Sequence, residues 1–332
     1  MLFILCPNVL IYLVCTIKSI LFYSILYLPT FYERTFLIQH HYVEGESRYV
    51  WVADGAGKPV LVDLHESPDQ EVLNRSGANN EYWLYTRANP TTPQVLISGN
   101  AMSVWASNYL GSRPLKVIVH GFAADGNSDI NSMLTSAWLA TTNANIIVVD
   151  WRHIASSSYV TAVNEVPNIG RAVATFISWL INSAGGNWQN VHITGSGLGG
   201  QIAGIAGRHA SGTPRRLTGL DPVAAMWYDH PEAIGQTGHN EAQYVEVIHT
   251  HYTRPNSPRI GHVDFYPNGA NNQPGCTTSI CSHTRSYHLF AATIRYDHLI
   301  GVECFDTKEA QSNQCSGSML LHMGNDILTK NA

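Results

Sequence analysis

Residues 191–207 read VHITGSGLGGQIAGIAG, and this stretch decides the fold. An apolar strand is followed by a glycine-rich turn and then by a helix rich in small residues. These three parts form the setting of a nucleophile elbow, whose pattern is G-x-S-x-G. Here the frame is Gly195-Ser196-Gly197-Leu198-Gly199, so a glycine stands where the serine belongs. The stretch therefore predicts an elbow that has lost its nucleophile.

Ser196 is the alternative nucleophile within this turn. A serine at the tip needs glycines two residues before it and two residues after it, and those positions hold Thr194 and Leu198. The glycines matter because the sharp turn brings backbone close to backbone and forces a positive φ at its tip. We expect Ser196 to lie beside the tip, as a turn residue that bonds its own backbone.

Short apolar runs surround this stretch on both sides. Because the runs are continuous rather than alternating, they predict strands that are buried on both faces. Helical patterns at 168–184 and 198–210 separate some of the runs, and such alternation predicts a mostly parallel central sheet with helices on both faces, an α/β architecture. The runs are LKVIVHGF (115–122), ANIIVVDW (144–151), VHITG (191–195), RLTGLD (216–221) and YVEVIHT (244–250).

Two further residues complete a candidate constellation with Gly197. Asp221 ends a predicted strand in GLDP, where its carboxylate would hold the tautomer of a histidine. His283 follows Cys281 in CSHTRSY, and we expect it in a loop restrained by a disulfide, as a general base requires. The chain order of nucleophile, acid and histidine is that of α/β-hydrolases. The alternatives are a turn aspartate before Pro222 and an ordinary hydrogen-bonding histidine.

Two backbone amides are candidates for an oxyanion hole. Such a hole combines the N–H that follows the nucleophile with an N–H from a strand–loop junction. Those groups would belong to Leu198 and to Phe122, which ends the first strong strand in His120-Gly121-Phe122. The alternative is that this tripeptide only turns the chain.

Composition sets limits on the class of protein. The chain has 332 residues, of which 45% are hydrophobic and 13% charged, so it is long enough for one large core and is not a disordered chain. Its formal net charge is −5 and it contains no basic run, which argues against nucleic acid as a partner.

The first thirty residues differ from the rest, because they contain two apolar runs and only one charged residue, Lys18. We expect residues 1–30 to be a cleaved secretory signal, although the usual basic start is missing. An uncleaved membrane anchor and a misassigned first exon are the alternatives. Residues 31–332 would then form one domain.

Six cysteines are present, and Cys6 and Cys15 lie in the apolar leader. The spacing of the other four suggests two local bridges, Cys276–Cys281 and Cys304–Cys315, although four cysteines permit three pairings. Bridges indicate an oxidising compartment. The glycosylation sequon at Asn74 agrees with export. We therefore expect an extracellular protein, or a membrane-anchored one if the leader is retained.

The motifs together resemble the pancreatic-lipase family, in particular its insect phospholipase A1 and lipase-like branch. The resemblance covers roughly residues 80–327 and rests on VIVHGF, IIVVDW, HITGSGLGGQIAG, GLDP, EVIHT, GHVDFYPNG, QPGC, CSHTRSY and the last two cysteines. By position it implies that Asp221 and His283 are the family's acid and base, and that Phe122 and Leu198 are its oxyanion donors. Gly197 occupies the place of the nucleophile.

Three departures from the family pattern qualify what the resemblance implies. The missing serine puts hydrolysis in doubt, as in the family's yolk-protein branch, which stores nutrients and carries ligands. Only four residues separate Cys276 from Cys281, so no lid would cover the site, as in the phospholipase branch. The chain stops near its last cysteine, so we expect no carboxy-terminal β-sandwich.

The sequence therefore favours a catalytically impaired lipase homologue that binds lipid or phospholipid or serves as a yolk-like protein, with contact to a lipid surface. The family's calcium ligands do not map onto Trp227–Asn240, so we expect no metal and no cofactor. With the lid absent, we expect Trp227 and Phe122 to meet lipid directly. The alternative is an active lipase or phospholipase A1. It would use Ser196 or a water activated by His283, unless residue 197 is a sequence error.

Overall fold

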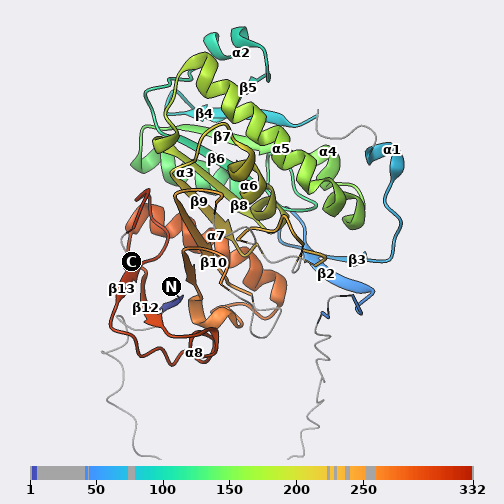
Figure 1. Ribbon diagram of the computed structural model, residues 1–332, viewed down its shortest axis with the longest axis vertical. Coiled ribbons are helices and arrows are strands. Elements are labelled where there is room, and N and C mark those ends of the chain that lie inside the picture. Colours follow the sequence, from blue (N-terminus) through green and yellow to red (C-terminus); the bar gives the residue numbers. More distant parts are fainter. Residues whose placement is uncertain are drawn as a thin grey trace, which may run out of the picture.

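The computed structural model describes residues 2–5, 42–43, 45–73, 79–222, 225–227, 230–235, 240–251 and 259–330. A large twisted sheet runs through these residues (Figure 1). Its strands are β1 (Leu2–Leu5), β4 (Glu81–Thr86), β5 (Asn89–Leu96), β6 (Leu115–Val119), β7 (Asn145–Asp150), β8 (Val191–Ser196), β9 (Arg216–Leu220), β10 (Tyr244–Ile248), β11 (Val263–Phe265), β12 (Ile300–Cys304) and β13 (Leu320–His322).

The strand order is β13-β12-β1-β11-β10-β9-β8-β6-β7-β4-β5. The run from β11 to β7 is parallel throughout, whereas β4, β5, β12 and β13 join by antiparallel pairing. The five apolar runs singled out in the sequence form β6 to β10, the centre of this parallel block. The predicted α/β-hydrolase fold with a mostly parallel central sheet is confirmed.

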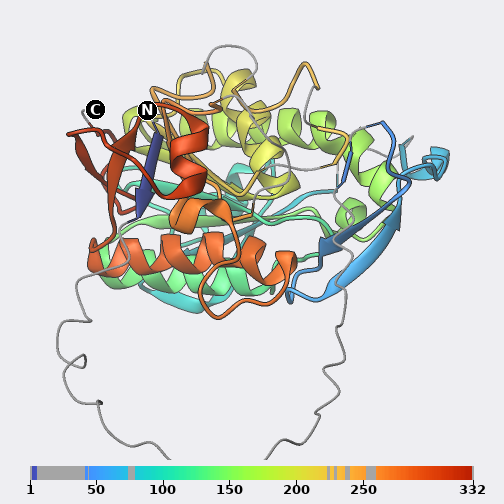
Figure 2. The same ribbon diagram turned by 90° about the horizontal axis from the view of Figure 1, so that it is seen from below.

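Helices cover both faces of the sheet, as Figure 2 shows. The long helices α5 (Tyr159–Ala184) and α6 (Leu198–His209) pack together on one face, and α3 (Asp129–Thr141) and α7 (Ser279–Tyr296) pack together on the other. The shorter helices are α1 (Gln70–Leu73), α2 (Ala101–Trp105), α4 (Arg152–Ala155), α8 (Thr307–Ser312), and the 3-10 turns η1 (Trp188–Asn190) and η2 (Pro267–Ala270).

The central strands feed two separate cores because side chains alternate along a strand. In β6, Val117 and Val119 join the core beneath α5 and α6, whereas Ile118 between them joins the core beneath α3 and α7. All three side chains are fully buried. This double burial explains why the strands read as continuous apolar runs.

Helix α5 is longer than the sequence predicts. Helix α5 begins nine residues before the predicted start at 168, with the Ser158 side chain capping it at the amide of Thr161. It continues through Pro167, which gives up one backbone hydrogen bond. Strands β2 (Tyr49–Ala53) and β3 (Pro59–Asp63) form a small antiparallel sheet of their own.

The predicted leader lies almost entirely outside the described residues, and so do Cys6, Cys15 and the sequon at Asn74. The exception is the backbone of Leu2–Leu5, which forms β1 between β11 and β12. None of the helices in the described ranges has both the length and the apolarity that crossing a membrane requires.

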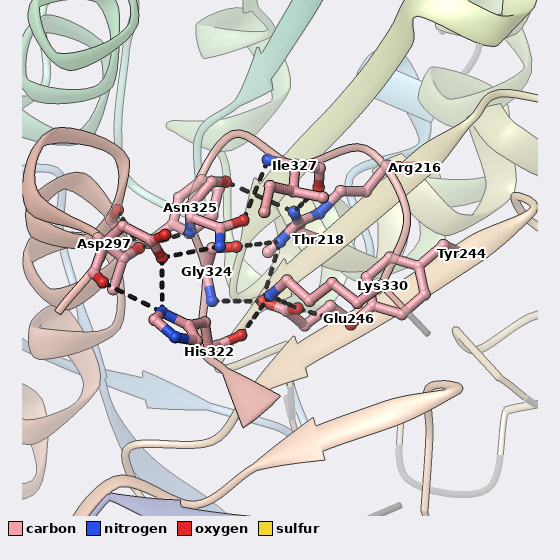
Figure 3. Close-up of polar contacts among 12 residues, drawn as sticks. Arg216, Thr218, Tyr244, Glu246, Asp297, His322, Gly324, Asn325, Ile327 and Lys330 are labelled. Carbon is pink, nitrogen blue, oxygen red and sulfur yellow. Dashed lines mark hydrogen bonds and ion pairs between the residues drawn. The ribbon is translucent and has the colours of Figure 1, made fainter. Parts of the chain in front are cut away.

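A buried ion network holds the C-terminal segment against the strand ends opposite the elbow (Figure 3). Arg216, at the start of β9, donates to the Glu246 carboxylate at 2.9 Å and to the carbonyl of Gly324 at 3.0 Å. Lys330 and the Tyr244 hydroxyl donate to the other oxygen of Glu246 at 2.6 and 2.8 Å. This network closes the end of the sheet that faces away from the candidate site.

Candidate active site

Gly197 forms the tip of the turn between β8 and α6. Its φ of 54° and ψ of −125° lie in a region that side chains with a Cβ rarely adopt. Its amide donates to the carbonyl of Leu220 at 3.2 Å, and its carbonyl accepts from the amide of Gly200 at 2.9 Å. The backbone therefore has the strained geometry of a nucleophile elbow.

The glycines on either side of the tip are required by close backbone contacts. A Cβ on Gly195 would lie 2.0 Å from the carbonyl oxygen of Gly199. A Cβ on Gly199 would lie 2.3 Å from the carbonyl oxygen of His120. Both separations are far shorter than any real contact, so the elbow keeps the small residues that its motif demands.

Ser196 is the last residue of β8, one position before the tip. It pairs with Leu220 of β9, and only 5% of its surface is exposed. Its backbone is thus part of the sheet ladder rather than of the exposed turn.

Asp221 directly follows β9 and is buried. One carboxylate oxygen accepts from the amides of Thr250 and His251 at 3.0 and 3.2 Å, and the other lies 2.7 Å from Nδ1 of His283. Burial raises the pKa of Asp221, but the hydrogen bond from His283 and the nearby histidines lower it more, so the pKa lies below its usual value. The group is therefore a fixed, ionised acceptor for the imidazole.

His283 lies in the first turns of α7, which corrects the prediction that it sits in a loop. The helix begins right after Thr278, whose side chain accepts from the amide of Cys281. The Cys276–Cys281 bridge is present and joins this first turn to the preceding loop. The hydroxyls of Thr250 and Ser286 donate to the carbonyl of His283. A capped helix therefore fixes the ring more firmly than a loop would.

Gly197 and His283 face each other directly. A Cβ built on Gly197 would lie 3.5 Å from Nε2 of His283, an ordinary van der Waals distance. A serine hydroxyl is one bond further out from that Cβ, so it would come within hydrogen-bond reach of the imidazole. Gly197, His283 and Asp221 therefore stand in the arrangement of a triad in which the hydroxymethyl side chain of the serine is absent.

The two candidate oxyanion amides lie at the edge of this arrangement. Leu198 is the first residue of α6, so its amide has no acceptor within the helix. Among the described residues no acceptor faces the amide of Phe122 either. The loop that carries Phe122 touches the elbow, because a Cβ on Gly121 would lie 3.2 Å from the carbonyl of Ser196.

His120 holds this loop in place, a role that sequence reasoning missed. Its buried ring places Nδ1 2.9 Å from the carbonyl of Gly121 and accepts the amide of Trp151 at Nε2. Nε2 also lies 3.4 Å from Asp150. The signal in the sequence was a histidine and an aspartate that end adjacent strands.

Thr250 and His251 were also missed, because they act on Asp221 through their amides. Backbone contacts of this kind do not depend on the residue type, so the sequence does not reveal them. Thr250 and His251 follow β10 in VIHTH. The available clue was that this strand ends beside the strand that ends in GLDP.

Trp227 contradicts the expectation that it meets lipid directly. Only 1% of its surface is exposed, and it packs in the core beneath α5 and α6. Phe122 is 9% exposed and stacks edge to face on Tyr159 at 5.0 Å. The other predicted bridge, Cys304–Cys315, is present at the end of β12.

Comparison with known proteins supplies a family. A model of the family described as Lipase matches residues 57–327. Pancreatic lipase-related protein 2 of Bos taurus is 33% identical over 261 residues, which cover 70% of this chain and 55% of that protein. Pancreatic triacylglycerol lipase of Oryctolagus cuniculus is 31% identical over 264 residues, which cover 71% of this chain and 56% of that protein. The chain thus spans about half the length of these relatives.

Proposed function

The chain belongs to the lipase family, within the pancreatic-lipase group, and we propose that it is a lipid-binding homologue that has lost nearly all ester hydrolysis. One observation carries this proposal. The Asp221–His283 pair has the geometry of an acid and a base, yet it faces a glycine rather than a hydroxyl. The binding parts of a lipase site are kept while the atom that attacks the ester is missing.

The expected loss of activity is large. Removing a triad nucleophile costs on the order of 10⁶ in turnover in another hydrolase, and it leaves only oxyanion and binding contributions. Ser196 is a poor substitute, because it belongs to β8 and its backbone pairs with Leu220. A water activated by His283 would attack the ester without the advantage of a tethered nucleophile.

We further propose that the protein is extracellular and that its partners are lipids or phospholipids, with contact to a lipid surface. The two disulfides support an oxidising compartment. The short loop between Cys276 and Cys281, which leads straight into α7, supports a site without the family's lid, as in the phospholipase A1-like branch.

The test is an assay of the full chain on a short-chain ester and on phosphatidylcholine, together with binding of a fluorescent phospholipid. We expect binding without turnover and no covalent labelling by an organophosphate. Labelling of Ser196, with turnover lost in Ser196→Ala, would instead establish an active lipase. A chain that neither binds lipid nor hydrolyses it would contradict the proposal altogether.

A further inference from the structure

The absent side chain at Gly197 leaves a small open space at the centre of the site. A Cβ at this position would have only two described atoms within 4 Å beyond its chain neighbours, Cε1 and Nε2 of the His283 ring. No described residue has moved in to fill the place of the lost hydroxyl. A polar atom of a ligand can therefore stand where the serine oxygen would have been.

The groups around this space are hydrogen-bond donors or become donors on protonation. Asp221 holds Nδ1 of His283, which leaves Nε2 pointing at the space without a partner among the described residues. When Nε2 carries a proton, the ring is a charged donor. Within the described part of the chain the amides of Phe122 and Leu198 have no acceptor. Helix α6, twelve residues long, adds the partial positive charge of its N-terminus at Leu198.

This combination matches a group with one negative charge and two acceptor oxygens. One oxygen would receive the two amides and the other would receive the proton on Nε2, and charge-assisted bonds of this kind are the strong ones. Phe122 and Leu198 both belong to the large apolar core, so apolar side chains surround the two amides. The ring of Tyr159 packs against Phe122, and its hydroxyl donates to the carbonyl of Ala225.

We propose that the site binds the carboxylate of an unesterified fatty acid, seated between the two amides and His283 in the space that Gly197 opens. This inference rests on the proposed lipid-binding function and specifies its ligand. An intact ester carries no charge and shares no proton with Nε2, so it makes the weaker complex. A serine at residue 197 would occupy the space with its own oxygen and compete for Nε2.

Binding in this form is coupled to one proton. A carboxylate meets a lone pair at Nε2 of the neutral ring, so the complex needs a proton between the two atoms. Asp221 and His251 are the titratable groups that interact with His283. Burial lowers the pKa of His251, although Asp221 opposes this shift. Asp54 and Asp129 act on Tyr287, one turn further along α7. The loop after β6 carries Asp125 and His120, and the buried ring of His120 lies against Asp150 and Trp151.

The experiment titrates the full chain with dodecanoate below its micelle concentration, by calorimetry in two buffers of different ionisation enthalpy. Methyl dodecanoate is the uncharged control. We expect dodecanoate to bind roughly tenfold or more tightly than its ester. Its affinity should fall as the pH is raised, because the complex needs a proton on Nε2 of His283.

Two variants test the assignment to this site. Gly197→Ser should weaken dodecanoate binding, and His283→Gln should weaken it and remove its pH dependence. His288→Gln is the matched control, because His288 lies on the same helix and bonds only the carbonyl of Thr284. It should bind like the native chain.

Equal binding of acid and ester, or binding of dodecanoate that does not change with pH, would overturn the inference while leaving lipid binding in place. Unchanged dodecanoate binding in folded Gly197→Ser would also overturn it. If neither ligand binds, the proposed lipid-binding function fails as well. Because dodecanoate has no ester bond, residual hydrolysis cannot affect its own titration, and the methyl ester is checked after its titration for released dodecanoate.

Discussion

At the scale of the residue, position 197 decides whether this site can do covalent chemistry. The strained backbone at Gly197, the buried carboxylate of Asp221 and the capped ring of His283 are all in place. A lipase places its nucleophile in such a strained turn because the strain exposes the hydroxyl. Glycine adopts this positive φ without the strain that a serine would have, and it carries no hydroxyl.

We predict that Gly197→Ser lowers the free energy of unfolding by about 1–3 kcal/mol, less the entropy that glycine loses on folding. The cause is the positive φ, since the new Cβ has room. Chemical denaturation measures the change. Gly99→Ser is the matched control, because Gly99 also has a positive φ and nothing lies near its Cβ. A Gly197→Ser variant that is more stable than the native chain would show that the elbow is not strained.

At the scale of the element, sequence predicted the strands better than the helices. Strands β6 to β10 are buried on both faces, so their apolar runs are unmistakable. Helix α7 was not predicted, because its first turns, SICSHTRSYH, are mostly polar. Those turns carry the site, where polar side chains face Asp221 and the elbow rather than the core.

The buried charges of β9 and β10 could not be placed from sequence either. Arg216 and Glu246 interrupt apolar runs, and their partners Gly324 and Lys330 lie about a hundred residues further on. Contacts over that separation depend on the whole fold. The sequence pattern alone indicates only the local periodicity of apolar residues, which predicts the type of element.

The Lys330–Glu246 pair predicts a pH dependence of stability. Burial lowers the pKa of Lys330 to about 8, although Glu246 opposes the shift. Between pH 8 and the usual range of lysine, the unfolded chain holds a proton that the folded chain has released. Stability should therefore rise with pH there, by up to about 1.4 kcal/mol per pH unit.

Lys330→Met should remove this rise, as denaturation at pH 8 and pH 9.5 would reveal. Glu246→Gln should destabilise the chain by about 3–5 kcal/mol, because it leaves Arg216 and Lys330 buried without a countercharge. A native chain whose stability is flat over this pH range would argue against a strongly buried Lys330.

The short Cys276–Cys281 loop predicts lipid binding without an interfacial threshold. Four residues cannot cover the site, so no lid has to open. Binding of a short-chain phospholipid should rise smoothly as its concentration passes the micelle point. An abrupt increase at that point, abolished by tethering a loop within residues 225–243, would identify another segment as the cover.

At the scale of the whole molecule, the two ends of the central strands carry different groups of residues. The carboxyl ends of β8 and β9 carry Gly197 and Asp221, and the amino end of β9 carries the ion network around Arg216. Ligands bind at the carboxyl ends in sheets of this kind. The division explains how a rigid, tightly held scaffold can persist around a site that, as we propose, has lost its nucleophile.

The N-terminal leader gives a prediction at the same scale. If residues 1–30 are a cleaved signal, secretion removes β1, and β11 and β12 lose the ladder that joins them. We expect the intact mass of the secreted protein to match a start close to residue 31. A secreted mass that includes Leu2–Leu5 would mean that the leader is retained as part of the sheet.

The central claim is that the missing hydroxymethyl group at residue 197, and nothing else in the site, separates this chain from an active lipase. The most direct measurement is kcat/KM on a soluble short-chain ester for the native chain, Gly197→Ala and Gly197→Ser. We predict that only Gly197→Ser gains turnover, by several of the roughly six orders of magnitude that a nucleophile contributes, and that adding His283→Ala removes the gain. A folded Gly197→Ser variant no more active than Gly197→Ala would contradict the claim.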